Sequence, residues 1–223
     1  MRIRSFIIAY ALVLAILLFA DRRPKAGGHD HYSHVVDLTT TPDSSHAKES
    51  PTRIISPDSV IPGTWAAGQI PAERLIAPLI VLDLGTGSSS ADGRPISLDD
   101  IALWEERHGM IPQGAVVAIR CKNSGKRNDL TTTVSSTNPL PIERDAAQFL
   151  TDARYTIGFA VETPVNLTLD RTLARQLALR GSYVLEATAP FTALPATGSL
   201  IIVAPAKDKK PGDAPVRVLA MVR

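Results

Sequence analysis

The chain alternates short, continuous apolar runs with polar stretches that carry a helical pattern. A strand buried on one face alternates apolar and polar residues, whereas these runs are apolar at nearly every position, which is typical of strands covered on both faces. The predicted strands are His34–Leu38, Leu79–Leu84, Ala115–Cys121, Tyr155–Glu162, Tyr183–Glu186, Leu200–Ala204 and Val216–Val222.

Helices are predicted between several of these strands. Ser97 is a good N-cap for a helix over Leu98–His108, because an acidic pair follows it in the positively polarised first turn. Gly109 supplies the C-terminal stop. The other predicted helices are Pro71–Ile76, Pro141–Arg154 and Leu169–Arg180. Helices interleaved with strands place the chain in the α/β class.

Two polar segments lack a clear period. Residues 21–33 are Gly-containing and predict a linker, and Thr39–Ser59 is rich in Ser, Thr, Pro and charged residues and predicts a long loop. Loops of that length in a compact domain are functional or disordered in most proteins.

The most apolar segment lies at the N-terminus, where Arg2 and Arg4 precede the run Phe6–Ala20. Its fifteen residues would span roughly 22 Å as a helix, short of the ~30 Å membrane core, so residues 1–20 predict a cleaved signal peptide. An uncleaved inner-membrane anchor is the alternative, supported by the bulky Leu18 and by basic residues just after the run. Either reading predicts an exported domain, periplasmic or extracellular.

Composition narrows the class of protein further. Residues 34–223 are enough for one domain with a sizeable core, and 44% hydrophobic with 21% charged residues is ordinary for a globular protein. A net charge of +2 argues against a nucleic-acid partner, and membrane contact is expected only through the N-terminal segment. Cys121 is the sole cysteine, which excludes an internal disulfide.

Common catalytic and binding motifs are absent or incomplete. No Gly-x-Ser-x-Gly pentapeptide occurs, which disfavours a nucleophile-elbow hydrolase. The turn at Gly85–Ser88 lacks the Lys of a phosphate-binding loop and the third Gly of a dinucleotide fingerprint. The histidines of the predicted linker and the charged run at Lys207–Lys210 are interpreted as solvated residues.

Four segments in order nevertheless resemble the cyclase family, which includes bacterial kynurenine formamidase, an arylformamidase of tryptophan catabolism. They are Ser33–Thr39 (SHVVDLT), Gln69–Asp83 (QIPAERLIAPLIVLD), Ile111–Val117 (IPQGAVV) and Ala214–Ala220 (APVRVLA). The resemblance implies a single-domain swivelling β/β/α fold that forms a homo-oligomer and has a cleft for a small molecule. It also implies a zinc or manganese ion that activates water to attack an amide or ester carbonyl.

The metal-binding residues that the resemblance implies are largely replaced. The family supplies ligands from a run His-x-x-x-His-x-Asp-x-x-x-His and from a later His and Glu. An ungapped alignment back from Trp65 places these six positions at Glu49, Arg53, Ile55, Ser59, Ala174 and Glu186. Two carboxylates without imidazole form a weak transition-metal site, so we expect no metal cofactor.

Arg53 is a candidate substitute for the metal's positive charge, because its guanidinium can pair with Glu49 or Glu186. The alternative is an Arg53 that points to solvent. The resulting hypothesis is a catalytically impaired protein, or one repurposed for binding. An active exported hydrolase of amide or ester bonds, aryl formamides among them, is the other candidate. It would use Glu49 and Glu186 with a loop histidine such as His46, or a different alignment of residues 46–59 that places His46 at a ligand position.

Overall fold

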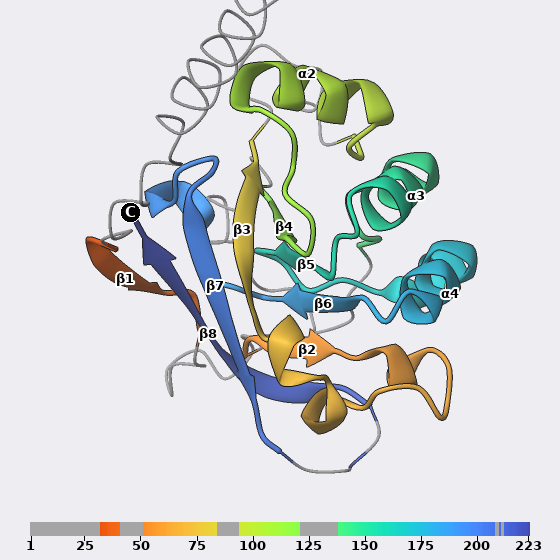
Figure 1. Ribbon diagram of the computed structural model, residues 1–223. Coiled ribbons are helices and arrows are strands. Elements are labelled where there is room, and N and C mark those ends of the chain that lie inside the picture. Colours follow the sequence, from red (N-terminus) through yellow and green to blue (C-terminus); the bar gives the residue numbers. More distant parts are fainter. Residues whose placement is uncertain (1–31, 41–50, 84–93, 121–137, 208–209, 211) are drawn as a thin grey trace, which may run out of the picture. The chain divides into compact units, whose positions relative to one another are not determined.

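The computed structural model describes residues 32–40, 51–83, 94–120, 138–207, 210 and 212–223 (Figure 1). The predicted signal peptide and most of the predicted linker lie outside these residues, as do Glu49 and His46, so those predictions are not tested. Among the described residues, none of the helices has the length and apolar character needed to cross a membrane.

The sheet has eight strands in the order β1-β8-β2-β6-β5-β4-β3-β7, and β7 also pairs with β8. This extra pairing closes seven strands into a barrel-like ring, and β1 adds to the edge of β8. The run β3-β4-β5-β6 is parallel, and the remaining pairs are antiparallel. The strands are β1 His34–Asp37, β2 Arg53–Ile55, β3 Ile76–Leu82, β4 Val116–Ile119, β5 Gly158–Val161, β6 Tyr183–Glu186, β7 Ser199–Pro205 and β8 Ala214–Val222.

Three α-helices cover one side of the parallel strands (Figure 1). They are α2 Leu98–His108, α3 Arg144–Ala153 and α4 Arg171–Leu179, and the 3-10 turns are η1 Pro57–Ser59, η2 Ala67–Gln69, η3 Ala72–Arg74, η6 Leu167–Asp170 and η7 Phe191–Ala193. The bounds of α2 match the predicted helix, whereas α3 and α4 begin two to three residues later than predicted.

Alternate residues of the parallel strands enter two separate cores, which confirms that these strands are covered on both faces. In β3, Leu79 and Val81 belong to the core inside the ring. Ile80 and Leu82 belong to the core beneath the helices. Trp104 of α2 joins this second core, and its indole N–H donates a 3.0 Å hydrogen bond to the carbonyl of Val81. The mixed α/β single domain predicted from the sequence is therefore confirmed.

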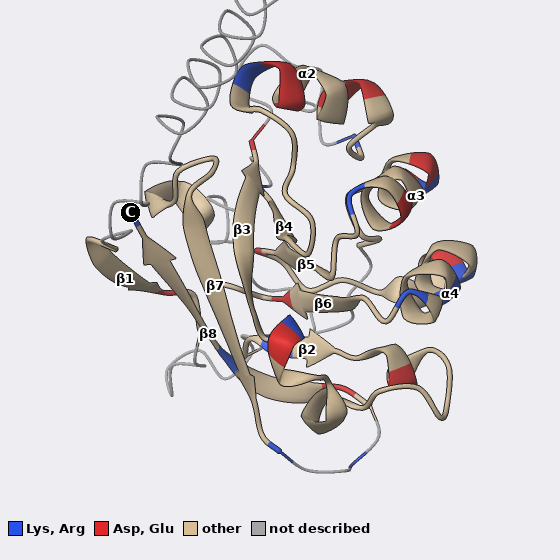
Figure 2. Ribbon diagram, in the orientation of Figure 1, with Lys and Arg blue, Asp and Glu red and all other residues tan. Residues whose placement is uncertain are grey.

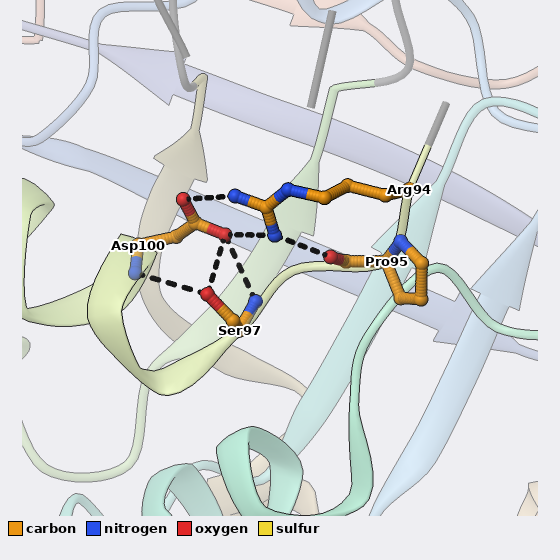
Figure 3. Close-up of polar contacts among 4 residues, drawn as sticks. All are labelled: Arg94, Pro95, Ser97 and Asp100. Carbon is orange, nitrogen blue, oxygen red and sulfur yellow. Dashed lines mark hydrogen bonds and ion pairs between the residues drawn. The ribbon is translucent and has the colours of Figure 1, made fainter. Parts of the chain in front are cut away.

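The start of α2 shows the predicted cap (Figure 3). The hydroxyl of Ser97 accepts from the backbone N–H of Asp100, and the Asp100 carboxylate accepts from the backbone N–H of Ser97 at 2.9 Å. Arg94 adds an ion pair of 2.7 Å to the same carboxylate. The Arg94 ion pair and the Ser97 hydrogen bonds outweigh burial and hold the pKa of Asp100 below its usual value.

Two predictions of local structure were wrong. The predicted loop Thr39–Ser59 contains β2 and η1, because tertiary pairing with β6 and β8 makes a strand of three residues that have no strand pattern of their own. The predicted helix Pro71–Ile76 is the single 3-10 turn η3, and Ile76 already begins β3.

Candidate functional site

Four of the six positions implied by the family resemblance meet at one cavity. Ile55 of β2, Ser59 of η1, Ala174 of α4 and Glu186 of β6 all line a hollow of about 780 Å³. The rest of the lining is Val60, Val165, Asn166, Leu167, Thr168, Arg171, Arg175 and Asp213.

Glu186 enters the cavity from the carboxyl end of β6. The two preceding positions alternate between the cores, with Leu185 inside the ring and Val184 beneath the helices, so Glu186 points to the helix side as Val184 does. Its Oε2 accepts a 2.8 Å hydrogen bond from the backbone N–H of Val165. Burial raises the pKa of Glu186 and outweighs the hydrogen bond from the Val165 N–H, which lowers it. The negative charge of Asp213 adds to the rise, and the positive charge of Arg53 opposes it.

The backbone just after Glu186 is held in an unusual conformation. Ala187 has a φ of 52°, which glycine adopts far more readily than alanine. Its carbonyl accepts hydrogen bonds from the hydroxyls of Thr40 at 2.7 Å and Thr52 at 2.8 Å. These two bonds fix the exit of β6 and, with it, the direction in which the Glu186 carboxylate points.

Arg53 lies opposite Glu186 in the antiparallel pair of β2 and β6. Its guanidinium donates at 3.4 Å to the backbone carbonyl of Asp213, and Arg53 does not line the cavity. Within the described residues, no ion pair or hydrogen bond joins Arg53 to Glu186, although the charge of Arg53 acts to lower the pKa of that carboxyl group. Pairing of Arg53 with Glu49 lies outside the described residues.

The donor groups around the cavity do not fit a transition metal. Ile55 and Ala174 offer only hydrocarbon, and the Ser59 hydroxyl donates to Oδ1 of Asp213. In the described part of the chain, no three His, Cys, Asp or Glu side chains lie close enough together to hold a metal ion. The carboxylates of Glu186 and Asp213 lack the imidazoles that zinc sites of this chemistry use.

Residue-by-residue reading of the sequence did not identify several cavity residues. Asp213 reaches the cavity because β8 pairs with β2 far away along the chain, and no local pattern indicates this. Arg171 and Arg175 had a detectable signal, because residues at i and i+4 share a face of a helix.

Comparison with known proteins assigns the family. A family model described as "Putative cyclase" matches residues 18–166, more than half of the chain. The chain belongs to this cyclase family. An isatin hydrolase of Roseibium aggregatum is 29% identical over 171 residues, which cover 67% of this chain and 61% of that protein, so the match spans less than two thirds of its length.

Solved structures of the cyclase family have the same fold. Isatin hydrolase A from Labrenzia aggregata, bound to benzyl benzoate, superposes with a TM-score of 0.69 at 24% identity, covering 85% of this chain and 93% of that one. Isatin hydrolase A from Ralstonia solanacearum superposes with a TM-score of 0.69 at 21% identity, covering 96% of this chain and 97% of that one. A predicted metal-dependent hydrolase from Bacillus stearothermophilus superposes with a TM-score of 0.57 at 21% identity, covering 85% of this chain and 98% of that one. The hydrolase-like cyclase fold expected from the resemblance is confirmed.

Proposed function

We propose that this cyclase-family protein binds a small molecule in the cavity beside Glu186 and does not hydrolyse it by metal-activated water. The observation that carries the proposal is the chemistry at Ile55, Ser59 and Ala174. These residues meet at one cavity, where the resemblance implies an aspartate and two histidines, and they offer two hydrocarbon side chains and a hydroxyl.

Hydrolysis by a bound metal needs several ligands at once, because one or two carboxylates neither hold the ion firmly nor leave it poised to lower the pKa of water. The cavity of about 780 Å³ has a mixture of apolar and polar walls without those ligands. Pockets of roughly 300–1,000 Å³ with this mixture commonly bind small molecules. A cavity of this size without the family's metal ligands supports binding of a small molecule over its hydrolysis.

An exported hydrolase with a rearranged site is the second candidate. It is supported by similarity to an isatin hydrolase and by Glu186, whose raised pKa suits a carboxyl group that exchanges protons. In this candidate Glu49 and His46 would complete the site together with Glu186.

Metal analysis of the full chain, with an assay on the same sample, decides between the two. The protein would be loaded with zinc or manganese, dialysed, and assayed with isatin and with an aryl formamide. We expect substoichiometric metal and no turnover. Stoichiometric metal, with turnover that is lost in Glu186→Ala, would establish the hydrolase instead.

A gain-of-binding variant tests the assignment of the positions themselves. Ile55→Asp, Ser59→His and Ala174→His combined would place one carboxylate and two imidazoles around Glu186. If the four positions correspond to the family's metal site, this variant should bind zinc at least about tenfold more tightly than the unmodified chain, equivalent to about 1.4 kcal/mol. Unchanged zinc affinity in a folded variant would contradict the assignment.

A further inference from the structure

Arg171 and Arg175 stand apart from most arginines of the described chain. Eight others pair with carboxylates or donate to backbone carbonyls, namely Arg53, Arg74, Arg94, Arg120, Arg144, Arg154, Arg180 and Arg217. Within the described residues, the guanidinium groups of Arg171 and Arg175 have no hydrogen bond or ion pair, and both line the cavity beside Glu186.

The position of this pair is unfavourable for the helix by itself. Arg171 is the first residue of α4, at the N-terminal end where the helix macrodipole disfavours positive charge. Arg175 follows one turn later. Like charges at i and i+4 also repel each other. The nearby acidic residues do not relieve this repulsion, because Asp170 pairs with Arg144 at 2.7 Å and Asp152 pairs with Arg180 at 2.8 Å.

A feature that costs stability without a compensating contact is expected at functional sites. Here an anion bound between the two guanidinium groups would supply the missing partner. Guanidinium groups bind carboxylates through two parallel hydrogen bonds, a geometry that a spherical ion cannot reproduce. The amide of Asn166 and the hydroxyl of Thr168 line the same cavity as the arginines.

The acidic residues of the cavity do not cancel this attraction. Figure 2 shows an acidic position at the end of β6 and basic positions on α4. Glu186 is the last residue of β6, and burial raises its pKa, so it carries its charge less readily than an exposed glutamate. Asp213 accepts the hydroxyl hydrogen bond of Ser59. The apolar part of the cavity lining includes Ile55, Val60, Val165 and Ala174.

We infer that Arg171 and Arg175 bind the carboxylate of an organic acid whose apolar body lies against Ile55, Val60 and Ala174. This inference rests on the proposed function, since it names the chemical class of the molecule that the cavity binds. The two guanidinium groups supply the positive charge that the carboxylate needs. Binding therefore requires no metal.

Titration calorimetry on the full chain tests the inference with a matched pair of probes, 2-naphthoate and its neutral amide 2-naphthamide. At low ionic strength, naphthoate should bind at least about tenfold more tightly than naphthamide, because hydrogen bonds to a charged group are the stronger kind. The preference should fall as salt is added. In the double variant Arg171→Gln/Arg175→Gln the preference should disappear. In Arg107→Gln, which changes an exposed arginine of α2 that does not line the cavity, the preference should remain.

The inference would be overturned by equal binding of the two probes, by full naphthoate binding in the double variant, or by binding of neither probe. Tight binding of naphthamide alone would reject the carboxylate site and leave the proposed binding function standing. Failure of the proposed function has a different signature, because metal-dependent turnover is measured in a separate assay that does not depend on naphthoate affinity.

Discussion

The hydroxyl of Thr52 donates a 2.8 Å hydrogen bond to the carbonyl of Ala187, the residue directly after Glu186. Thr52 is buried, and its oxygen also accepts from the backbone N–H of Thr40 at 2.7 Å. One side chain therefore joins the segment after β1, the start of β2 and the end of β6. The position of the site carboxylate depends on this connection.

Replacement of Thr52 by the isosteric valine should lower the free energy of unfolding by about 1–3 kcal/mol, because the Thr40 N–H loses its acceptor in a buried site. Chemical denaturation measures the effect. Thr172→Val, on the exposed face of α4, is the matched control and should change stability by less than about 0.5 kcal/mol. Equal effects of the two substitutions would show that the Thr52 hydroxyl does not hold the strand exit.

Gly158 allows a large side chain inside the ring. It lies opposite Tyr183 in the parallel pair of β5 and β6, and a Cβ at position 158 would lie 2.6 Å from Cε2 of the Tyr183 ring. Gly158→Ala should therefore destabilise the protein by about 1–3 kcal/mol through overpacking. In a Tyr183→Leu background the same substitution should cost much less, and a double-mutant cycle with no coupling would contradict the explanation.

Glu186 should make the protein less stable as pH rises. Since burial raises its pKa in the folded state, the folded protein holds this proton more tightly than the unfolded chain does. The stabilisation from the proton is present at acidic pH and is lost between the ordinary glutamate pKa, about 4.3, and the raised value of the folded protein. The free energy of unfolding of Glu186→Gln, relative to that of the wild type, should increase as pH increases across this range. Chemical denaturation of both proteins measures it. Glu106→Gln, an exposed substitution on α2, is the control for the loss of one carboxylate.

Glu105 should have the opposite pH dependence. Arg154 binds both of its carboxylate oxygens at 2.8 Å, and the N–H of Ile111 donates to Oε1 at 2.9 Å. The Arg154 bonds lower the pKa of Glu105, so its stabilisation is present above the ordinary glutamate pKa and is lost as pH falls through the lowered value. Glu105→Gln should cost about 1–2 kcal/mol at neutral pH and less in acid, as measured by denaturation.

The exposed ion pair of Arg217 and Asp37 is the comparison for Glu105. Its side chains are 66% and 46% exposed, against 19% and 16% for the Arg154 and Glu105 pair. Solvent screens an exposed pair, so Asp37→Asn should cost less than about 1 kcal/mol. A larger loss for Asp37→Asn than for Glu105→Gln would contradict the assigned role of burial.

Local patterns were sufficient to predict most of the regular structure. The continuous apolar runs predicted the parallel strands, because a strand covered on both faces must be apolar at successive positions. Ser97 and Gly109 marked the ends of α2, because capping depends on the residues at the helix ends. Three-residue β2 was missed, since its strand geometry comes from its neighbours β6 and β8.

The sequence by itself determined the fold class and the family, because each depends on local pattern or on order along the chain. The residues at the family's metal-ligand positions stay a prediction of the ungapped alignment. Only the tertiary structure decided that Ile55, Ser59, Ala174 and Glu186 share one cavity, that Arg53 contacts Asp213, and that Arg171 and Arg175 complete the wall. Residues 53–59 lie more than 100 residues along the chain from α4, β6 and Asp213. The pairing of β2 with β6 and β8, which brings them together, leaves no pattern in either segment alone.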